Sequence, residues 1–408
     1  MSHHRVTFVH LACVGFAALH GCVGRPVIGE RDPDKNVQSG ACEDDGLNCD
    51  DWGAPEKFPE IDQDAFRVET FVADAGCTGE TQELRLSGTQ TVADLAVSCG
   101  TLRLVVANDA DVALLQPVLR RARVEIASEG SARVTIDAAR GDHVSIALEG
   151  ASTLRLRTLD GVEDLRIDAA AKGIGWDVEI EDSSLPRLHV RTSSDAALLL
   201  RRTRVEDARV SAGRLSLQGA TLIDPVLDVK ELIAAGTDVN EGYLRARRGS
   251  FLNGTFTDVS LQGCESFLIA DTAIKHSDVG ACAAGPMELR NTTVEQSIVR
   301  GRVFALLSRM SECILGAEDR ASLSLFDSTI VWSLLCEVES LSARGGSVLF
   351  CARCEPASPR AACIDEASAV AVVHCPEVAA ASACNEPLPD SPRQPTADAG
   401  TADAAAAP

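Results

Sequence analysis

Acidic and amide side chains recur at turn-like positions in the middle of the chain, where they could support chemistry. The recurring residues are Asp182, Asp271, Asn291 and Asp327. Such a row can bind Ca²⁺ or supply the acid–base pair of a glycosidase. Other residues interrupt it at equivalent places, namely Gly219, Gly345, Arg202 and Ser308. Turns favour Asp, Asn and Gly in their own right, so we interpret the row as structural.

Other reactive residue types form no recognised constellation. The four histidines beyond the N-terminal region are widely separated and have no partner at metal-ligand spacing: His143, His189, His276 and His374. The chain contains no G-x-S-x-G, H-E-x-x-H or P-loop pattern. We therefore expect no catalytic residue, no metal site and no cofactor.

Arginines cluster in two places, Arg120, Arg121 and Arg123, and Arg201, Arg202 and Arg204. We expect surface ion pairs there, and binding of an acidic glycan is the alternative. A nucleic-acid partner is not expected, because the formal net charge is −22 and phosphate binding needs a basic face.

The N-terminus is typical of an exported chain. After His3, His4 and Arg5, an apolar run over residues 6–19 has signal-peptide length and ends in Leu19-His20-Gly21-Cys22. These four residues resemble the bacterial lipobox, which implies a diacylglycerol anchor on Cys22. The alternative is an ordinary cleaved signal with Cys22 in a disulfide. Val23 stands where the enteric inner-membrane retention signal has Asp, which favours the outer membrane.

Composition divides the chain into five parts. We predict a signal peptide over 1–21, an acidic flexible tether over 22–66, and a strand-rich body over 67–355. A Cys-rich C-terminal cap over 356–387 and a disordered Ala/Pro/Asp tail over 388–408 follow. The acidic stretch between Cys42 and Asp51 resembles a calcium loop but lacks the ligands of an EF-hand, so we interpret it as a small disulfide loop.

The body must position any site, and it is repetitive. Short segments alternate apolar and polar residues, which indicates strands. One series of apolar positions recurs about every 20 residues: Leu104, Ile126, Ile146, Ile167, Val190, Val210 and Val229. A second series runs half a period away, through Ile136, Leu156, Ile180, Leu200, Leu217, Ile233, Ile269, Leu289, Leu306, Leu325 and Ala343. The segment 234–268 has no clear phase.

A repeat of this length without helices predicts an all-β fold, a single-stranded parallel β-helix or β-solenoid. The turn chemistry resembles that of right-handed parallel β-helix proteins, the broad fold family of pectin lyases, tailspikes and many bacterial surface proteins. Pentapeptide-repeat proteins are the second alternative, because Phe251, Phe256 and Leu261 are spaced by five. A narrow aliphatic core agrees with an aromatic content of 4%.

The repeat also predicts disulfides. Fifteen cysteines in an exported chain favour an oxidising compartment. Neighbouring coils lie about 4.8 Å apart, within the Cα separation of a disulfide, so cysteines one period apart can be joined. We predict Cys77–Cys99, Cys264–Cys282 and Cys336–Cys354, with Cys42–Cys49 as a local loop. We expect the C-terminal group to cap the solenoid rather than bind zinc, with Cys313, Cys351, Cys363, Cys375 and Cys384 unassigned.

These observations favour a non-enzymatic, lipid-anchored protein of the bacterial cell envelope, with a rod that meets a glycan or protein partner. A polysaccharide lyase or glycoside hydrolase on the same fold is the alternative. The sequence gives no oligomeric state.

Overall fold

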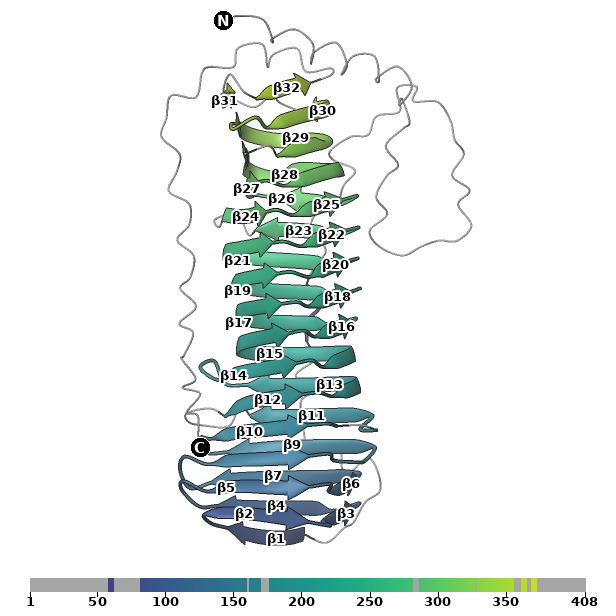
Figure 1. Cartoon of the computed structure of the whole chain (residues 1–408), viewed down its shortest axis with the longest axis vertical. Coiled ribbons are helices and arrows are strands. Elements are labelled where there is room, and N and C mark those ends of the chain that lie inside the picture. The colour runs from purple at the N-terminus through teal and green to yellow at the C-terminus, as the bar shows by residue number, and fades with distance from the viewer. Residues whose placement is uncertain are drawn as a thin grey trace, which may run out of the picture.

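The computed structural model describes residues 58–61, 81–159, 161–169, 176–281, 286–327, 329–355, 361–364 and 368–372. These residues contain strands and no helix, and the paired strands run parallel to each other. The strands stack into a long rod with the earliest coils at one end (Figure 1). The predicted parallel β-solenoid is therefore confirmed.

Each coil passes three faces, which we name A, B and C in the order in which the chain meets them. Strands that begin on face A are β1 (Thr81–Leu86), β4 (Thr101–Val106), β7 (Ala122–Ser128), β9 (His143–Glu149), β11 (Asp164–Ala169), β17 (Val226–Ala235), β19 (Tyr243–Leu252), β21 (Ser260–Ala270), β23 (Asp278–Ala281) and β26 (Ile298–Arg300). Face B holds β2 (Thr89–Ala93), β5 (Asp111–Leu115), β8 (Arg133–Asp137), β10 (Thr153–Arg157), β12 (Asp177–Glu181), β14 (Ala197–Arg201), β24 (Pro286–Arg290), β27 (Arg302–Leu306) and β31 (Ala361–Ile364).

Face C holds short strands and the beginnings of the longest ones. The short strands are β3 (Ala96–Ser98), β6 (Val118–Arg120), β16 (Thr221–Ile223), β18 (Asp238–Asn240), β20 (Thr255–Thr257), β22 (Ala273–Lys275), β25 (Thr293–Glu295) and β32 (Ala369–Val372). Long strands that continue from face C around the corner are β13 (Ser184–Thr192), β15 (Arg204–Gln218), β28 (Arg309–Phe326), β29 (Ile330–Ala343) and β30 (Val348–Glu355). Strands β31 and β32 pair with β29 and β30, so the solenoid extends into the range 356–387 that we predicted as a cap.

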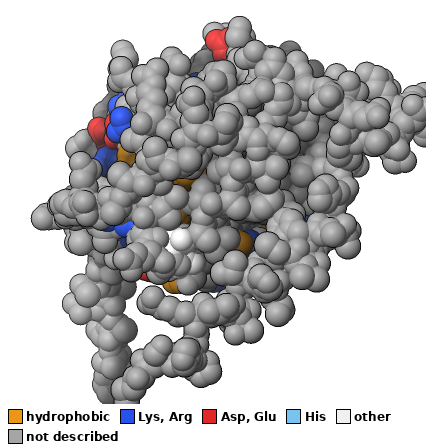
Figure 2. Space-filling model, turned by 90° about the horizontal axis from the view of Figure 1, so that it is seen from above, with side chains coloured by type: hydrophobic (Ala, Val, Ile, Leu, Met, Phe, Trp, Pro, Cys, Tyr) orange, Lys and Arg blue, Asp and Glu red, His pale blue; other side chains and the backbone are white. Residues whose placement is uncertain are grey.

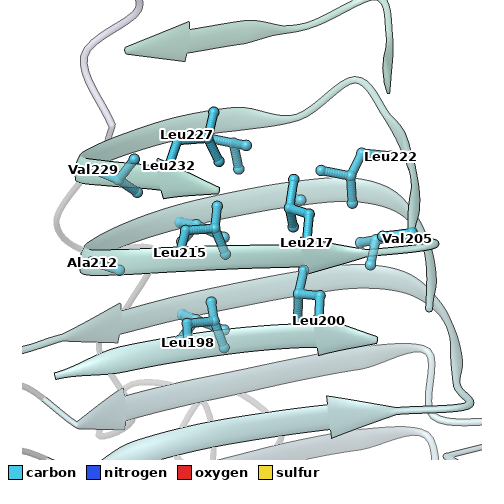
Figure 3. Close-up of a cluster of buried hydrophobic side chains, with 14 of the residues drawn as sticks. Leu198, Leu200, Val205, Ala212, Leu215, Leu217, Leu222, Leu227, Val229 and Leu232 are labelled. Atoms are coloured by element: carbon cyan, nitrogen blue, oxygen red, sulfur yellow. The ribbon is translucent and has the colours of Figure 1, made fainter. Parts of the chain in front are cut away.

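The core is a column of inward side chains on each face. On face B the column runs through Val92, Leu114, Ile136, Leu156, Ile180, Leu200, Leu217, Ala234, Phe251, Ile269, Leu289, Ala305, Leu325 and Ala343. The coils differ in length, so the step along the sequence is shortest from Leu289 to Ala305 and longest from Leu156 to Ile180. Figure 3 shows Leu198, Leu200, Leu215 and Leu217 on successive strands, directed into the interior. Burial of this continuous apolar column is the main driving force for folding.

The second predicted series was wrong by one residue at two places. Ala234 and Ala305 occupy the inward positions that we assigned to Ile233 and Leu306. Ile233 is 38% exposed because it points to the other side of its strand.

The first series follows the inward side of face A, with two errors in the pairing. Ile126 pairs with Leu148 rather than Ile146. Likewise, Val210 pairs with Leu227 rather than Val229. The segment 234–268 continues the solenoid, since Phe251, Phe256 and Leu261 are inward residues of faces B, C and A in turn. The register between β19 and β21 shifts once, between Ala246 and Arg248. The spacing of five therefore arises from the passage of one short coil over three faces.

The corner between faces B and C contains one left-handed residue per coil. These residues are Asp94, Gln116, Ala138, Thr158, Asp182, Arg202, Gly219, Gly236, Asn253, Asp271, Asn291, Leu307, Asp327 and Gly345. The backbone N–H of most of these residues donates to a carbonyl of the next coil. Asp182 N–H, for example, donates to Arg201 O at 3.0 Å. The predicted turn row is confirmed, except that Leu307 and not Ser308 is the left-handed residue in its coil. Ser308 is buried beside it.

Candidate functional site

Two carboxylates of the B–C corner, those of Asp182 and Asp271, are bound to side chains of the following coil. Arg202 donates from Nε and Nη2 to the two carboxylate oxygens of Asp182, at 2.6 and 2.7 Å. The hydrogen bond from Arg202 lowers the pKa of Asp182 below its ordinary value. Further along, the side-chain amide of Asn291 donates to Asp271 Oδ1 at 2.6 Å. These contacts join consecutive coils, which supports the structural interpretation of the row.

Buried hydroxyl groups line the inner side of the same corner. Thr292 Oγ1 donates to the carbonyls of Ile269 and Arg290, at 3.1 and 2.9 Å. Ser308 makes the equivalent pair of bonds, at 3.2 Å to Leu289 O and 2.9 Å to Leu306 O. These hydroxyls satisfy backbone carbonyls that the turn would otherwise leave buried without a donor. The Ser or Thr that follows the turn residue in sequence therefore has a structural role.

Cys313 occupies a serine-like position at the other corner. Ser277 and Ser297 precede it in the same column, and each donates to the carbonyl two residues earlier, at 2.7 Å. The buried thiol of Cys313 lies 3.2 Å from Ser311 O and 3.4 Å from Val294 O. Its burial and hydrogen bonds explain this cysteine as part of the corner.

Most residues of the two arginine clusters take part in ion pairs. In the first cluster, Arg121 lies 3.7 Å from Asp142 and Arg123 lies 2.9 Å from Glu125. In the second, Arg201 reaches Glu181 at 3.1 Å and Arg204 reaches Glu206 at 3.6 Å.

Such pairs recur along the outer faces. Glu181 also pairs with Arg157, at 3.6 Å, and so links β10, β12 and β14 across face B. Further pairs between coils are Arg155–Glu179, Arg191–Asp168, Arg214–Glu231, Arg245–Asp228 and Arg300–Asp278. Seen from above, basic and acidic side chains lie next to each other at the edge of the rod (Figure 2).

The described histidines are held at separate places on the surface. His276 Nε2 lies 2.6 Å from Gln296 Oε1, and its Nδ1 lies 3.9 Å from Asp258. On face A, His143 is paired in register with Asp164, and His189 with Arg166 and Arg209. His374 lies outside the described residues. Within the described ranges, no group of three His, Cys, Asp or Glu side chains could hold a metal ion.

The predicted disulfides are only partly covered by the described residues. Cys99 is disulfide-bonded, and its predicted partner Cys77 lies outside the described residues. Cys22, Cys42, Cys49, Cys282, Cys375 and Cys384 lie outside them as well. Cys336 is in register with Glu355, and Cys354 with Leu335, so this pair is displaced by one position from the register that we predicted. Cys351 and Cys363 are in register with Ser333 and Ser342.

Two of the hollows on the outer surface of the described coils contain charged side chains. One is an open groove of about 580 Å³ near the first coils, lined by both signs of charge, including Arg85, Arg103, Glu83, Glu129 and Glu149. Its described lining contains no aromatic side chain, although sugar rings commonly stack on aromatic faces. The charged lining of this groove therefore suits a polar ligand.

The other hollow lies where Phe58–Ile61 meets face A. It has a volume of about 290 Å³, and its wall includes Phe58, Ile61, Asp228 and Arg245. Residues 58–61 fall within the range 22–66 that we predicted as a flexible tether, and this segment packs on the solenoid. Their position was not predicted, because no local pattern around Phe58 indicates a tertiary contact.

Some outward side chains are buried on more than one face. On face A, Ser145, Asp164 and Arg300 are at most 3% exposed, and on face B, Glu181 and Glu288 are at most 8% exposed. Other outward side chains are open to solvent, such as that of Arg214 on face B, which is 61% exposed.

No protein-family model, curated protein or solved structure matches this chain at a significant level. The described part of the chain contains no helix long and apolar enough to cross a membrane.

Proposed function

We propose that the protein is a non-enzymatic lipoprotein of the bacterial cell envelope that presents a rigid β-solenoid. Residues 1–21 are its signal peptide, Cys22 carries the lipid, and the acidic segment after it is a tether. The outer membrane is the proposed site. The rod meets a glycan or protein partner, and nucleic acid is not a partner.

The observation that carries this proposal is the ladder of ion pairs between coils. Glu181 is paired with both Arg157 and Arg201 and so links three successive strands of face B. Side chains that are bound in this way stiffen the stack and leave a surface of mixed charge. Such a surface suits a scaffold that must remain soluble and extended.

The anchor follows from the lipobox-like Leu19-His20-Gly21-Cys22. Acyl chains contribute about 0.8 kcal/mol per buried methylene, and more than one chain gives stable attachment. We further propose that disulfides close the ends of the rod, where an uncovered strand edge would otherwise invite aggregation.

The anchor is tested by expression in a lipoprotein-competent bacterium followed by detergent partition. The wild-type chain should enter the detergent phase, and Cys22→Ser should remain in the aqueous phase. Cys13→Ser is the matched control, because Cys13 lies within the apolar run and should not affect partition. An unmodified Cys22 in mass spectrometry of the native protein would contradict the proposal.

The alternative is a polysaccharide-active enzyme, and the groove near the first coils is the observation that favours it. Glu129 and Glu149 both line this groove, and a pair of carboxyl groups is what glycoside hydrolysis requires. Incubation with neutral and acidic polysaccharides should give binding without new chain ends. Turnover that is lost in Glu129→Gln or Glu149→Gln would establish the enzyme instead.

A further inference from the structure

The segment Phe58–Ile61 makes specific contacts with the outer side of β17 and β19. Ile61 is 9% exposed and packs with Val226, which is 6% exposed. Phe58 and Tyr243 are partly buried at the edge of the same small cluster. Val226 precedes the inward Leu227 on β17, so its side chain points away from the core. An outward valine is buried here because the segment covers it.

Arg245 connects this cluster to the charges of face A. Its guanidinium carbon lies 4.2 Å from the centroid of the Phe58 ring. The same group donates to both oxygens of Asp228, at 3.0 Å from Nε and 2.6 Å from Nη2. The hydrogen bonds from Arg245 to Asp228 raise the pKa of Arg245, which stays charged. Asp228 thus holds a fixed cation in the position where an aromatic ring can stack on it.

The residue that follows Phe58 in the docked segment is a proline, which favours an extended ligand. Pro59 has a fixed φ and restricts the preceding Phe58 to extended conformations. The ordering of this segment therefore loses less entropy than that of an unrestricted chain.

We propose that the outer surface of β17 and β19 is a binding site for an extended Phe-Pro-Glu-Ile peptide, which the chain's own residues 58–61 occupy. Arg245 recognises the aromatic ring, and Val226 with Tyr243 recognises the aliphatic side chain. The bound segment is a strap that fixes the level at which the N-terminal region leaves the rod. Release of the strap opens the same surface to a peptide of this composition from another chain.

The strap also affects how the lipid-bearing Cys22 is connected to the rod, and this consequence rests on the proposed function. With the strap bound, residues 23–57 separate Cys22 from Phe58, which packs beside β17 and β19. These two strands lie in the middle of the rod (Figure 1). With the strap released, that attachment is lost, and β1, which begins at Thr81, is the first described strand after Cys22 in the sequence. The strap therefore sets both the length of the tether and the point on the rod where it pulls.

The chain offers a selective reporter for this site, because Tyr243 is its only tyrosine. The full chain carrying Cys22→Ser is labelled with 3-fluorotyrosine, so that a single ¹⁹F resonance reports the cluster. In this background, the double substitution Phe58→Ala/Ile61→Ala should move the resonance toward its position in a solvent-exposed tyrosine. Arg247→Ala is the matched control, since this exposed arginine on β19 does not line the hollow and should leave the resonance in place.

A synthetic peptide of residues 55–64 provides the second measurement. It should bind the double variant and restore the resonance, and it should bind the intact chain at least about tenfold more weakly, because the strap competes. A peptide with alanine at the positions of Phe58 and Ile61 should not bind. The same resonance in the intact chain and the double variant would overturn the proposal, and so would equal peptide binding to both. Circular dichroism of each variant verifies that the solenoid is retained.

The result is independent of the lipid anchor, because every protein in this experiment lacks Cys22. An unmodified Cys22 would therefore refute the lipid anchor and leave the peptide site intact. A ¹⁹F resonance that does not shift in the double variant would refute the peptide site alone.

Discussion

Arg300 of β26 forms a buried, two-bond ion pair with Asp278 of β23, one coil below, on the outer side of the rod. Its Nε and Nη2 atoms donate to the two carboxylate oxygens at 2.8 and 3.0 Å. The side chains are 3% and 10% exposed. The neighbouring residues Val279 and Val299 point into the core, so this pair is buried without being part of the core. Loss of one partner would leave the other charge without water or counter-ion.

Asp278→Ala should therefore lower the free energy of unfolding by about 3–5 kcal/mol. Arg214→Ala is the control, because Arg214 forms a 3.0 Å pair with Glu231 on face B but is 61% exposed. Its substitution should cost at most about 1 kcal/mol. Urea unfolding followed by circular dichroism measures both. Equal losses for the two variants would mean that Asp278 and Arg300 are hydrated in solution.

A second prediction tests the register of the core on face B. Leu217 is fully buried, whereas Ile233, in the following coil, is 38% exposed. Leu217→Ala should destabilise the protein by about 2–5 kcal/mol through the cavity that it creates. Ile233→Ala should change stability by no more than about 0.5 kcal/mol. The reverse order in urea unfolding would show that Ile233 and not Ala234 is the inward residue.

A third prediction concerns backbone strain at the B–C corner. Leu307 has a φ of 52° and is 58% exposed, so it bears the cost of a left-handed conformation with little burial in return. Leu307→Gly should raise the free energy of unfolding by about 0.5–1 kcal/mol. Gly219 has a φ of 61° in an earlier coil, and Gly219→Ala should lower stability. A destabilising Leu307→Gly would indicate that the leucine makes a contact of its own.

A fourth prediction follows from the environment of Asp142. Burial alone would raise its pKa, but hydrogen bonds from the backbone N–H groups of His143 and Arg121, each 2.9 Å long, outweigh burial and lower the pKa below 3.8. A carboxyl group with a lowered folded-state pKa stabilises the fold above its unfolded pKa, and this stability is lost as the pH falls through the folded value.

Wild type should therefore be more stable than Asp142→Asn at neutral pH, and the difference should shrink as the pH falls below 3.8. Unfolding midpoints between neutral and acidic pH measure this difference. A non-ionisable substitution on a nearby strand, Thr153→Ala, should give an offset that does not vary with pH. A constant offset for Asp142→Asn as well would rule out the carboxylate charge as the cause.

A fifth prediction is the disulfide Cys264–Cys282. Gly263 and Ala281, which directly precede the two cysteines, are paired in register, so the cysteines have the same offset along the chain as this pair. If this register continued by one position, the two Cα atoms would lie at disulfide distance. Peptide mapping without reduction should recover the linked pair. A bond from Cys264 to the C-terminal cysteines would instead show that the register changes after Gly263.

Sequence periodicity predicted the fold, the inward positions of Leu200 and Leu217, and the corner row. It failed at Ala234 because a small inward residue lies next to a large outward one, Ile233. Alanine is tolerated there since Phe251 follows it in the column, and the Phe251 ring packs with Phe256 at a centroid distance of 4.0 Å. The periodic pattern shows which single side chains are large and apolar. The core, however, is filled by the combined volume of the side chains that stack on one another.

The docked segment could not be predicted for a different reason. Phe58 and Ile61 lie in an acidic, proline-containing stretch, and their burial depends on Val226 and Arg245, which lie far away in the sequence. No local rule connects such distant residues. The groove near the first coils is similar, because its charged lining comes from strands β1, β4 and β9 and from the turn after β7.

The equal steps along the sequence that join Leu200, Leu217, Ala234 and Phe251 have a consequence for how such a chain can evolve. Consecutive coils of identical length make interchangeable cassettes. Duplication or deletion of the stretch of the gene that encodes one of these coils would add or remove a whole layer and leave every strand beyond it in its original pairing. The height of the protein could thus change between strains in increments of about 4.8 Å.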